Sequence, residues 1–376
     1  MKIVVNARVL IKNKLDGIGW FTFETLKRIT SICSADKFYF LFDRNFSDEF
    51  IFSDNIEPII VRPPTRHPIL WYYWFEHKLP LIIKKIKPDL FVSPDGYLSL
   101  TSNTPSVAVI HDINFIHFPH DFPLSSKLFY NHYFPLYAKK ASRIATVSEF
   151  SKNDIADNFH IAKDKIDVVY NGFNQIYSPI GEETKTINRK KYSAGSPYFI
   201  FVGSVHPRKN VANMLIAFDN FRQLTVNNVK LIIAGELMFK TGDIAAALKK
   251  MKFKNDVIFT GRMEPLQLKE LIGSAIALLL VSKLEGFGIP VIEAYQCQTP
   301  VIVSNLSALP EIASDGALYV NPFSVESISL AMCEMYNNNS KRQQLAENGY
   351  RIAQKYSWDN TAGLFLKCIL KVIDPE

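Results

Sequence analysis

The chain alternates short apolar runs with longer amphipathic stretches along almost its whole length. Six runs rich in β-branched and aromatic residues predict strands in the first half: Ile3–Val5, Phe38–Phe42, Pro58–Val61, Leu90–Val92, Val107–Ile110 and Ile144–Val147. The second half predicts six more: Phe199–Val202, Val229–Ala234, Val257–Phe259, Ile276–Val281, Pro300–Val303 and Leu318–Val320. Helical patterns lie near Val211–Leu224, Pro265–Ser274 and Pro290–Gln296. Most strand runs are apolar on successive positions, which is typical of parallel strands covered by helices on both faces.

This rhythm predicts an α/β protein with two Rossmann-like, doubly wound domains facing each other across a cleft. The segment Ser178–Pro197 is polar and contains two prolines and two glycines, which mark a boundary. We therefore expect a first domain at residues 1–185 and a second at residues 186–357. In such folds ligands bind beyond the carboxyl ends of the strands, so the residues that follow each strand are the candidates for chemistry.

Composition narrows the classes of function. With 376 residues and 48% hydrophobic content, the chain is too apolar to be disordered. Its net charge of +7 is spread out, with 24 basic and 20 acidic residues up to position 190 and 19 and 16 after it, so the basic stripe of a nucleic-acid-binding protein is not predicted. Four cysteines without a CxxC pair favour a cytoplasmic protein. The strongly apolar stretch Ala275–Val281 is too short to cross a bilayer, so any membrane contact is expected to be peripheral.

The segment Ser282–Ala294, SKLEGFGIPVIEA, carries the densest set of candidate residues. It follows a predicted strand and leads through a glycine loop to Pro290, which suits the first turn of a helix. Glycines let the backbone approach a ligand, and the amides of Phe287, Gly288 and Ile289 would point at an anion near the positive end of that helix. The pattern indicates a phosphate-binding loop.

Two carboxylates, Glu285 and Glu293, flank this loop. A carboxylate accepts two hydroxyl hydrogen bonds at once, as the diol of a ribose or a sugar requires. The alternatives are a favourable charge near a helix N-terminus for Glu293 and a solvated loop residue for Glu285. Spacing alone does not separate these interpretations.

A second anion site is predicted in the loop Gly203–Asn210, GSVHPRKN, which follows a strand and precedes a helix with Asn210 as its expected N-cap. Arg208 and Lys209 would lie at the carboxyl end of that strand and could neutralise a diphosphate without a metal ion. The alternative is a solvated basic turn, since charged loop residues are mostly exposed.

In the first half, Gly17 and Gly19 lie in a loop after the first strand, with a helix expected from Trp20. They match a dinucleotide-binding fingerprint incompletely, because Thr22 occupies the place of the third glycine. We interpret them as a loop of close approach to a ligand, with an ordinary turn as the alternative.

His111 follows a predicted strand and begins the sequence HDINFIHFPHD, which is rich in possible metal ligands. The spacing of His111, His117, His120 and Asp121 matches no standard zinc pattern, and Pro119 breaks a helix. No metal site is therefore predicted. His111 is expected to face the cleft.

Together these residues resemble the signature of retaining nucleotide-sugar glycosyltransferases of family 4, which have the two-domain GT-B fold. The resemblance rests mainly on EGFGIPVIEA, with its two glutamates separated by seven residues, and on FVGSVHPRKN. Weaker matches are GIGWF at 17–21, VIHD at 109–112, ATVSEFSK at 145–152, YNG at 170–172, TPVIVSNLSALPEI at 299–312 and YSW at 356–358.

The resemblance implies a role for each candidate residue. Glu293 would bind the ribose hydroxyls and Glu285 the donor sugar, while Arg208, Lys209 and the backbone of residues 287–289 would hold the diphosphate. Gly17 and Gly19 would approach the donor phosphate from the first domain, His111 would lie beside the transferred sugar, and a final helix at about 358–376 would join the first domain.

Two positions depart from the family pattern. Ser204 replaces an arginine that many relatives carry, which puts more of the phosphate charge on Arg208 and Lys209. Gln298 replaces a frequent glycine, a change interpreted as one of packing.

The predicted function is transfer of a hexosyl unit, with GDP-mannose as the first candidate donor, to a glycan or lipid-linked glycan in cell-surface polysaccharide synthesis. No cofactor or metal is expected. The alternatives are a non-catalytic sugar-nucleotide-binding protein of the same fold and an NAD-dependent oxidoreductase, which the incomplete glycine fingerprint disfavours.

The segment His67–Lys87 combines clustered aromatic residues with later lysines. Such a composition is found in segments that lie at a membrane surface. It also suits a core helix with outward lysines, the interpretation we prefer because Pro80 interrupts a long amphipathic surface. Peripheral contact with the inner face of the cell membrane stays open.

Overall fold

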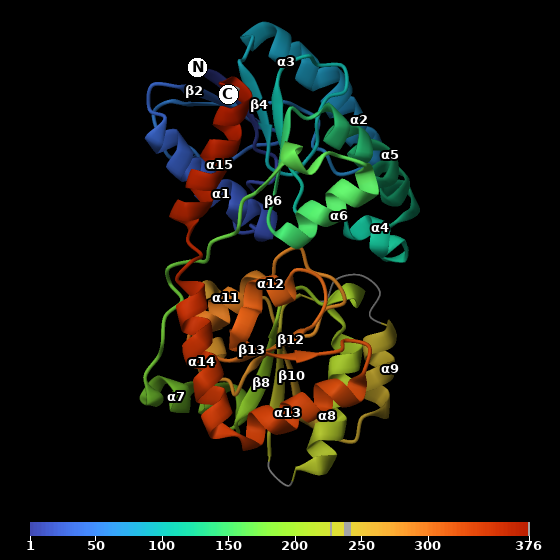
Figure 1. Cartoon of the computed structure of the whole chain (residues 1–376), viewed down its shortest axis with the longest axis vertical. Helices are drawn as coiled ribbons and strands as arrows, with labels where there is room; N and C mark the ends of the chain where they lie inside the picture. Colours follow the sequence, from blue (N-terminus) through green and yellow to red (C-terminus); the bar gives the residue numbers. More distant parts are fainter. Residues whose placement is uncertain (226–227, 237–241, 375–376) are drawn as a thin grey trace. The chain divides into compact units, whose positions relative to one another are not determined.

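The computed structural model describes residues 1–225, 228–236 and 242–374 and divides into two compact units. The first comprises Met1–Gly172 and Ser357–Glu376, and the second comprises Phe173–Tyr356 (Figure 1). The chain thus enters the second unit at Phe173, earlier than the expected boundary after residue 185. The reason is that Tyr177 and Ile180 are packed in the second unit, although the polar residues, prolines and glycines around them are typical of a linker.

The first unit is built on a parallel seven-stranded sheet in the order β3-β2-β1-β4-β5-β6-β7. Its strands are β1 (Lys2–Asn6), β2 (Lys37–Phe42), β3 (Ile56–Ile60), β4 (Leu90–Ser93), β5 (Ser106–Val109), β6 (Arg143–Thr146) and β7 (Ile166–Val168). Successive residues of β1 face different cores: Val4 packs with one buried cluster, and Ile3 and Val5 pack with another. Coverage on both faces explains why the strand runs are continuously apolar.

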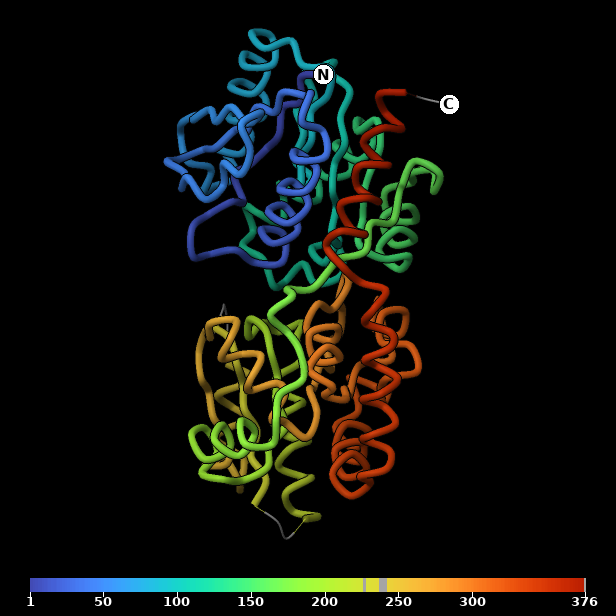
Figure 2. Tube along the Cα trace, turned by 90° about the vertical axis from the view of Figure 1, so that its left-hand side faces the viewer, coloured from blue at the N-terminus to red at the C-terminus, as the bar shows by residue number. Residues whose placement is uncertain are grey.

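The helices of the first unit are α1 (Gly17–Ile32), α2 (Pro68–Tyr73), α3 (Leu79–Ile86), α4 (Asn114–His117), α5 (Leu124–Lys140), α6 (Glu149–Phe159) and α15 (Trp358–Ile373). The chain returns from the second unit to place α15 beside α1 (Figures 1 and 2). Phe21 of α1 contacts Phe365 of α15, with ring centroids 5.4 Å apart. The expected final helix therefore packs on the first unit.

The second unit contains a parallel six-stranded sheet in the order β10-β9-β8-β11-β12-β13. Its strands are β8 (Tyr198–Val202), β9 (Lys230–Ala234), β10 (Val257–Gly261), β11 (Leu278–Leu280), β12 (Val301–Ser304) and β13 (Ala317–Val320). The helices are α7 (Glu182–Ser193), α8 (Val211–Leu224), α9 (Gly242–Lys250), α10 (Pro265–Gly273), α11 (Ile289–Gln296), α12 (Leu309–Ala313), α13 (Val325–Asn337) and α14 (Asn339–Ala353). Because β8 and β11 are hydrogen-bonded neighbours, the two loops that follow them lie side by side.

These two sheets confirm the predicted doubly wound α/β class with two Rossmann-like units. All twelve predicted strands form, and β7, which the pattern did not predict, is added at an edge. Within the described part of the chain, every helix is too short or too polar to span a membrane.

Candidate functional site

The turn after β8 brings Arg208 and Lys209 to the carboxyl edge of the second sheet. Pro207–Lys209 form a short 3₁₀ turn, and Asn210 adopts a left-handed conformation with φ of 63°. Asn210 is the N-cap residue of α8, as expected, but its side chain makes no capping bond: its amide donates to the Val281 and Pro322 carbonyls at 3.1 and 2.7 Å instead. These bonds fasten the basic turn to the end of β11.

Glu285 lies at the centre of a buried charge cluster. Lys209 Nζ donates to Glu285 Oε1 at 2.5 Å, and Arg208 Nη1 donates to Oε2 at 3.3 Å and to the Leu284 carbonyl at 2.9 Å. Ser282 Oγ adds a hydrogen bond to Oε1 at 2.6 Å. Two predicted anion-binding residues and one predicted sugar-binding residue therefore contact one another.

The charges of this cluster fix the protonation state of Glu285. Burial disfavours the carboxylate, whose residue is only 5% exposed, but the neighbouring Lys209 and Arg208 outweigh burial and lower the pKa of Glu285 to about 2. Glu285 is therefore ionised at neutral pH. Two cations against one carboxylate leave the cluster with a net positive charge, which suits it to an anionic ligand.

The glycine loop after Glu285 is tightly constrained by its surroundings. Gly288 has φ of 104°, a conformation that favours glycine, and a Cβ at this position would also lie 2.8 Å from Leu309 Cδ2, so the leucine would have to shift. Helix α11 begins at the next residue, Ile289, and receives no side-chain cap. Phe287 is buried and its ring lies 5.7 Å from that of Tyr356. The predicted phosphate loop therefore leads into a helix N-terminus, as expected.

Glu293 lies one to two turns into α11 and is partly buried. Burial raises the pKa of Glu293 to about 7, although the nearby Tyr177 hydroxyl opposes this rise. The two glutamates of the segment thus occupy opposite electrostatic environments. Near neutral pH, Glu293 titrates and Glu285 does not.

In the first unit, Gly17 and Gly19 form the first turn of α1, which begins three residues before the predicted start. The Asp16 side chain caps the helix by accepting from the Gly19 amide at 2.9 Å. A Cβ on Gly19 would lie 3.0 Å from Leu15 Cδ2, so internal packing favours glycine there. Gly17 is exposed.

His111 lies at the carboxyl end of β5, beside α1. Its Nε2 is 3.0 Å from the Pro94 carbonyl oxygen, and its ring meets that of Phe21 edge to face at 5.1 Å. Burial lowers the pKa of His111, so the imidazole is neutral at pH 7. The tautomer that donates from Nε2 to Pro94 leaves Nδ1 as a hydrogen-bond acceptor.

The remaining polar residues of HDINFIHFPHD have separate surroundings. His117 Nε2 pairs with the Asp154 carboxylate at 2.9 Å, and His120 is exposed. Within the described ranges, no three His, Cys, Asp or Glu side chains are grouped closely enough to hold a metal ion.

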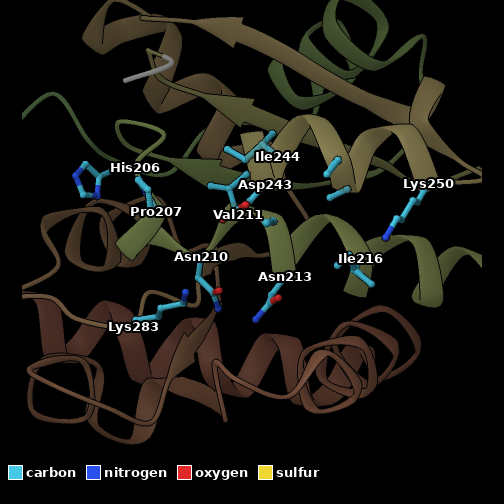
Figure 3. A pocket seen from close by; sticks show the side chains of 13 residues that line it. His206, Pro207, Asn210, Val211, Asn213, Ile216, Asp243, Ile244, Lys250 and Lys283 are labelled. Atoms are coloured by element: carbon cyan, nitrogen blue, oxygen red, sulfur yellow. The ribbon is translucent and has the colours of Figure 1, made fainter. Parts of the chain in front are cut away.

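A pocket of about 310 Å³ lies against the turn that contains Pro207 and Asn210 (Figure 3). Its walls come from α8 and α9, with Asn213 on one side and Asp243 and Ile244 on the other, and Lys283 at the turn. The predicted site residues do not line it. The pocket is therefore distinct from the Glu285 cluster, although both adjoin one turn.

The structure thus gathers the predicted residues into two groups. Arg208, Lys209, Glu285 and the loop before α11 belong to the second unit, and Gly17, Gly19 and His111 belong to the first. Sequence reasoning missed Ser282, which hydrogen-bonds to Glu285, and Tyr177, which acts on the pKa of Glu293. Ser282 could have been found from its place at the end of β11, three residues before Glu285, whereas Tyr177 carried no such signal.

Comparison with protein families identifies two matches. Residues 183–352 match the family described as "Glycosyl transferases group 1", and residues 35–175 match "Glycosyltransferase Family 4". Each match covers most of one unit. The Glu285 cluster and α11 lie within the first of these matches.

Two curated relatives are similar over long stretches. The O-antigen chain mannosyltransferase B of Escherichia coli is 24% identical over 371 residues, which span 96% of this chain and 97% of that protein. The O-antigen chain mannosyltransferase RfbU of Salmonella typhimurium is 30% identical over 262 residues, which span 68% of this chain and 67% of that protein.

Solved structures share the fold over the full length. WaaG, a glycosyltransferase involved in lipopolysaccharide biosynthesis, has a TM-score of 0.73 and 16% identity, with 100% of both chains covered. Anabaena HepE, solved with UDP-glucose, has a TM-score of 0.77 and 17% identity, with 99% of this chain and 100% of that chain covered. The predicted GT-B fold class is confirmed.

Proposed function

Because the chain belongs to the group 1 glycosyl transferases, we propose that it transfers mannose from GDP-mannose, with retention of configuration, to a glycan or lipid-linked glycan acceptor of a cell-surface polysaccharide. The choice of sugar rests on the mannosyltransferases among its relatives. UDP-glucose, which HepE binds, is the main competing donor.

The observation that carries this proposal is the contact of Lys209 and Arg208 with Glu285 beside the N-terminus of α11. When a glycosidic bond to a nucleoside diphosphate breaks, negative charge grows on the leaving oxygen. A guanidinium, an ammonium and helix amides that are already fixed in place stabilise this charge more in the transition state than in the ground state. Arg208 and Lys209 then supply the positive charge that a metal ion would otherwise supply, and we propose that no metal or cofactor is used.

The two glutamates have different tasks in this scheme. Glu285, held ionised by its cations, accepts hydrogen bonds from hydroxyls of the donor sugar. Glu293 accepts the two hydroxyls of the ribose. Neither acts as a nucleophile: the bond from the anomeric carbon to the diphosphate breaks, the acceptor oxygen attacks from the same face, and the acceptor proton passes to a phosphate oxygen of the leaving group.

Gly17, Gly19 and His111 belong to the first unit, to which we assign the acceptor. Gly17 and Gly19 lie in the first turn of α1, and we assign to this turn the approach to the donor phosphate. The neutral His111 orients a sugar hydroxyl through Nδ1, since Nε2 is engaged by the Pro94 carbonyl.

A surface of the first unit supports a lipid-linked acceptor at the inner face of the membrane. In the segment predicted as a core helix, Trp74, Phe75 and Leu79 are fully buried, whereas its exposed residues include both large apolar side chains and lysines. Pro80 lies in the first turn of α3, and a π-helical stretch, Trp74–Lys78, joins α2 to α3. The α2–α5 surface consists of the exposed residues Ile69, Tyr72, Tyr73, Leu81, Leu124 and Leu128.

Aromatic rings join two of the elements that carry the α2–α5 surface, α2 and α5. Trp71 stacks on Tyr130 with centroids 5.5 Å apart, and Tyr72 lies 6.0 Å from Tyr133. The exposed Lys84 and Lys85 flank it on α3. Exposed apolar residues beside lysines suit an anionic membrane surface.

Co-sedimentation with anionic vesicles tests this contact. Leu128→Ser should weaken vesicle binding, whereas Leu330→Ser, which changes a similarly exposed leucine on α13 of the second unit, should not. Equal binding of both variants, or no salt-sensitive binding of the parent protein, would exclude the α2–α5 surface as a membrane contact.

Donor identity is tested by thermal unfolding with GDP, UDP, ADP, TDP and NAD, followed by transfer of a labelled sugar. A ligand at 100 times its Kd adds about 2.7 kcal/mol to native stability, which raises Tm by roughly 5–11 °C at about 2–4 °C per kcal/mol. A shift with GDP alone and turnover of GDP-mannose are expected. A shift with UDP alone would replace the donor, a shift with NAD alone would favour an oxidoreductase, and binding without turnover would favour a non-catalytic protein.

A further inference from the structure

A buried arginine lies at the carboxyl edge of the first sheet, where the chain leaves β1. Arg8 is only 8% exposed. Its guanidinium donates to three side chains: Nε to Asn6 Oδ1 at 3.1 Å, Nη1 to Thr65 Oγ1 at 2.8 Å and Nη2 to Asp95 Oδ2 at 2.7 Å. Because each nitrogen of the guanidinium has a protein acceptor, Arg8 is placed to hold other segments of the chain and not to contact a substrate.

Three aromatic rings enclose this guanidinium. The Arg8 Cζ atom lies 4.5 Å from the ring centroid of Phe75, 4.8 Å from that of Tyr97 and 5.4 Å from that of Trp74. A cation is attracted to the faces of aromatic rings, and close packing restricts the side chain to one position. The Arg8 guanidinium is therefore fixed in place.

Asp95 is held through both of its carboxylate oxygens. Oδ2 accepts from Arg8, and Oδ1 accepts from Asn6 Nδ2 at 2.6 Å and from Ser93 Oγ at 3.0 Å. The Asp95 side chain is 8% exposed. A buried ion pair adds little net stability compared with an apolar pair of the same size. The role of this pair is therefore expected to lie in what it positions.

Asp95 belongs to a tight turn that follows β4. The Gly96 amide donates to the Ser93 carbonyl at 3.2 Å, and Pro94 occupies the second position, where its fixed φ favours a turn. Gly96 has φ of 82°, and a Cβ there would lie 3.2 Å from the Val109 carbonyl oxygen, so the turn packs tightly against β5. The Pro94 carbonyl and the Asp95 amide share one planar peptide unit, so anchoring Asp95 fixes the direction of this carbonyl.

The Pro94 carbonyl links this turn to His111, with its oxygen 3.0 Å from Nε2. A carbonyl can only accept, so the neutral imidazole carries its proton on Nε2 and leaves Nδ1 as an acceptor. We propose that Arg8 and Asp95 are positioning residues for His111: they hold the peptide whose carbonyl selects this tautomer and fixes the ring. This inference rests on the proposed function, in which Nδ1 of His111 orients a sugar hydroxyl.

Loss of the pair leaves His111 uncharged at neutral pH. Burial lowers the pKa of His111, against the opposing effects of the Pro94 carbonyl and of three carboxylates, those of Asp112, Asp16 and Asp95. Removing the Asp95 carboxylate and releasing the Pro94 carbonyl therefore lower this pKa further. A change in turnover at pH 7 then reports the position and tautomer of the ring, and not its charge.

The test replaces both charges at once, in the double variant Arg8→Met with Asp95→Asn. Replacing both avoids leaving one buried charge unpaired, which is strongly destabilising. Transfer from saturating GDP-mannose to methyl α-mannoside, the acceptor probe, should fall about tenfold because the ring is no longer held in place. When His111 is already alanine, the same double replacement should change transfer less than about twofold, because its effect passes through His111. Equal losses in both backgrounds would overturn the proposal.

A second readout observes the tautomer directly and needs no substrate. In protein labelled with ¹⁵N at histidine, the signals of the two ring nitrogens depend on which of them carries the proton, and His111→Ala identifies the signals of His111. At a pH where the imidazole is neutral, the parent should show the tautomer protonated at Nε2, and the double variant should show a mixture of both. A parental tautomer in the folded double variant would count decisively against the pair.

Arg143→Met with Asp167→Asn is the matched control. Arg143 begins β6, at the opposite edge of the same sheet, and pairs with Asp167 at 2.6 Å. This variant also loses an ion pair of the first unit, but without touching His111. Whatever its thermal midpoint, its transfer rate and its His111 tautomer should stay parental. Loss of the tautomer in this control would show that general loosening of the unit, and not the Arg8–Asp95 pair, governs His111.

Ser93→Ala takes the place of the double variant if circular dichroism shows that the latter is unfolded. It removes one hydrogen bond on Asp95 Oδ1 and should lower transfer about two- to fivefold, only when His111 is present. His111→Ala separates the two levels of failure. If it keeps parental transfer, the role of His111 in the proposed function is wrong and the proposal falls with it. If it loses transfer while the double variant keeps parental transfer and tautomer, only the role of Arg8 and Asp95 is wrong.

Discussion

The Lys209 ammonium lies 2.5 Å from the Glu285 carboxylate, although 76 positions separate the two residues. Removing Lys209 leaves Glu285 buried with less compensating charge and takes one cation from the proposed diphosphate site. Lys209→Ala should therefore lower kcat by about 100–1000-fold with saturating donor. Turnover of labelled donor sugar measures this loss.

The control for that prediction is Lys250→Ala, which changes an exposed lysine on α9 of the same unit. Its turnover should match that of the parent protein. Near-parental turnover of Lys209→Ala would show that the leaving diphosphate is stabilised elsewhere. Circular dichroism and the thermal midpoint of each variant establish that the second unit remains folded.

Glu285 should stabilise the protein above acidic pH. Its pKa of about 2 in the folded chain is below its ordinary value of 4.5, so the unfolded chain binds more protons between these values. The stabilisation, of about 3 kcal/mol at 1.36 kcal/mol per unit, is present above pH 4.5 and is lost as pH falls through 2. Thermal midpoints between pH 2.5 and 8 should show the difference between the parent and Glu285→Gln narrowing in acid. A constant difference would contradict the ionised, paired state of Glu285.

Glu293 should have the opposite effect on stability. Because its pKa is raised to about 7, the folded chain binds more protons than the unfolded chain between pH 4.5 and 7, and the free energy of unfolding falls as pH rises across this range. Glu293→Gln removes this penalty. The thermal midpoint of Glu293→Gln minus that of the parent should increase as pH rises from 4.5 to 7. A difference that stays constant with pH would show that Glu293 titrates normally.

His111 should act by position. Its lowered pKa keeps the imidazole neutral at pH 7, so protonated His111 is not expected to shape the activity profile above pH 6.5. His111→Ala should lower kcat about 10–100-fold and leave nucleotide binding, measured by calorimetry, unchanged. His120→Ala, which changes an exposed histidine of the same segment, should be neutral. A weaker nucleotide affinity in His111→Ala would place this residue on the donor instead.

Much of the fold was predictable because both sheets are parallel and buried on both faces. Continuous apolar runs marked twelve strands, and α8 was predicted with its observed bounds. The edge strand β7 was missed since Asp167 interrupts its pattern; this carboxylate pairs with Arg143 of the neighbouring strand β6. An edge strand pairs with a neighbouring strand on one side only, so it can carry charged residues and its sequence shows a weaker apolar pattern.

The site residues that follow predicted strands could be predicted from the sequence. Arg208, Lys209 and Glu285 follow two strands that turned out to be adjacent, and parallel strands bring such residues to one edge. Tyr177 could not be identified in this way, because it lies in a segment of turn-forming residues and follows no strand, although the folded chain buries it. Asn210 was assigned a local capping bond, whereas its amide serves two distant carbonyls.

Gln298 occupies a position that favours glycine. It follows α11 with φ of 53°, donates its amide to the Tyr295 carbonyl at 2.9 Å, and precedes Thr299, whose amide donates to the Ala294 carbonyl at 2.9 Å. These two bonds form a Schellman motif, in which the left-handed residue is usually glycine. The sequence alone suggested that this departure from the family pattern is a change of packing. The Gln298 side chain is exposed, so the departure concerns backbone conformation instead.

Gln298→Gly should therefore stabilise the protein. Relief of the left-handed strain outweighs the greater flexibility of glycine in the unfolded chain by about 0.5–1 kcal/mol, which raises Tm by about 1–4 °C. Differential scanning calorimetry measures the change, and Gln298→Ala, which keeps the Cβ, should show no gain. A lower Tm for the glycine variant would mean that the exposed glutamine contributes contacts that offset its strain. Because the residue lies five positions after Glu293 on the chain, unchanged donor KM in the glycine variant would show that stability was gained without disturbing the site.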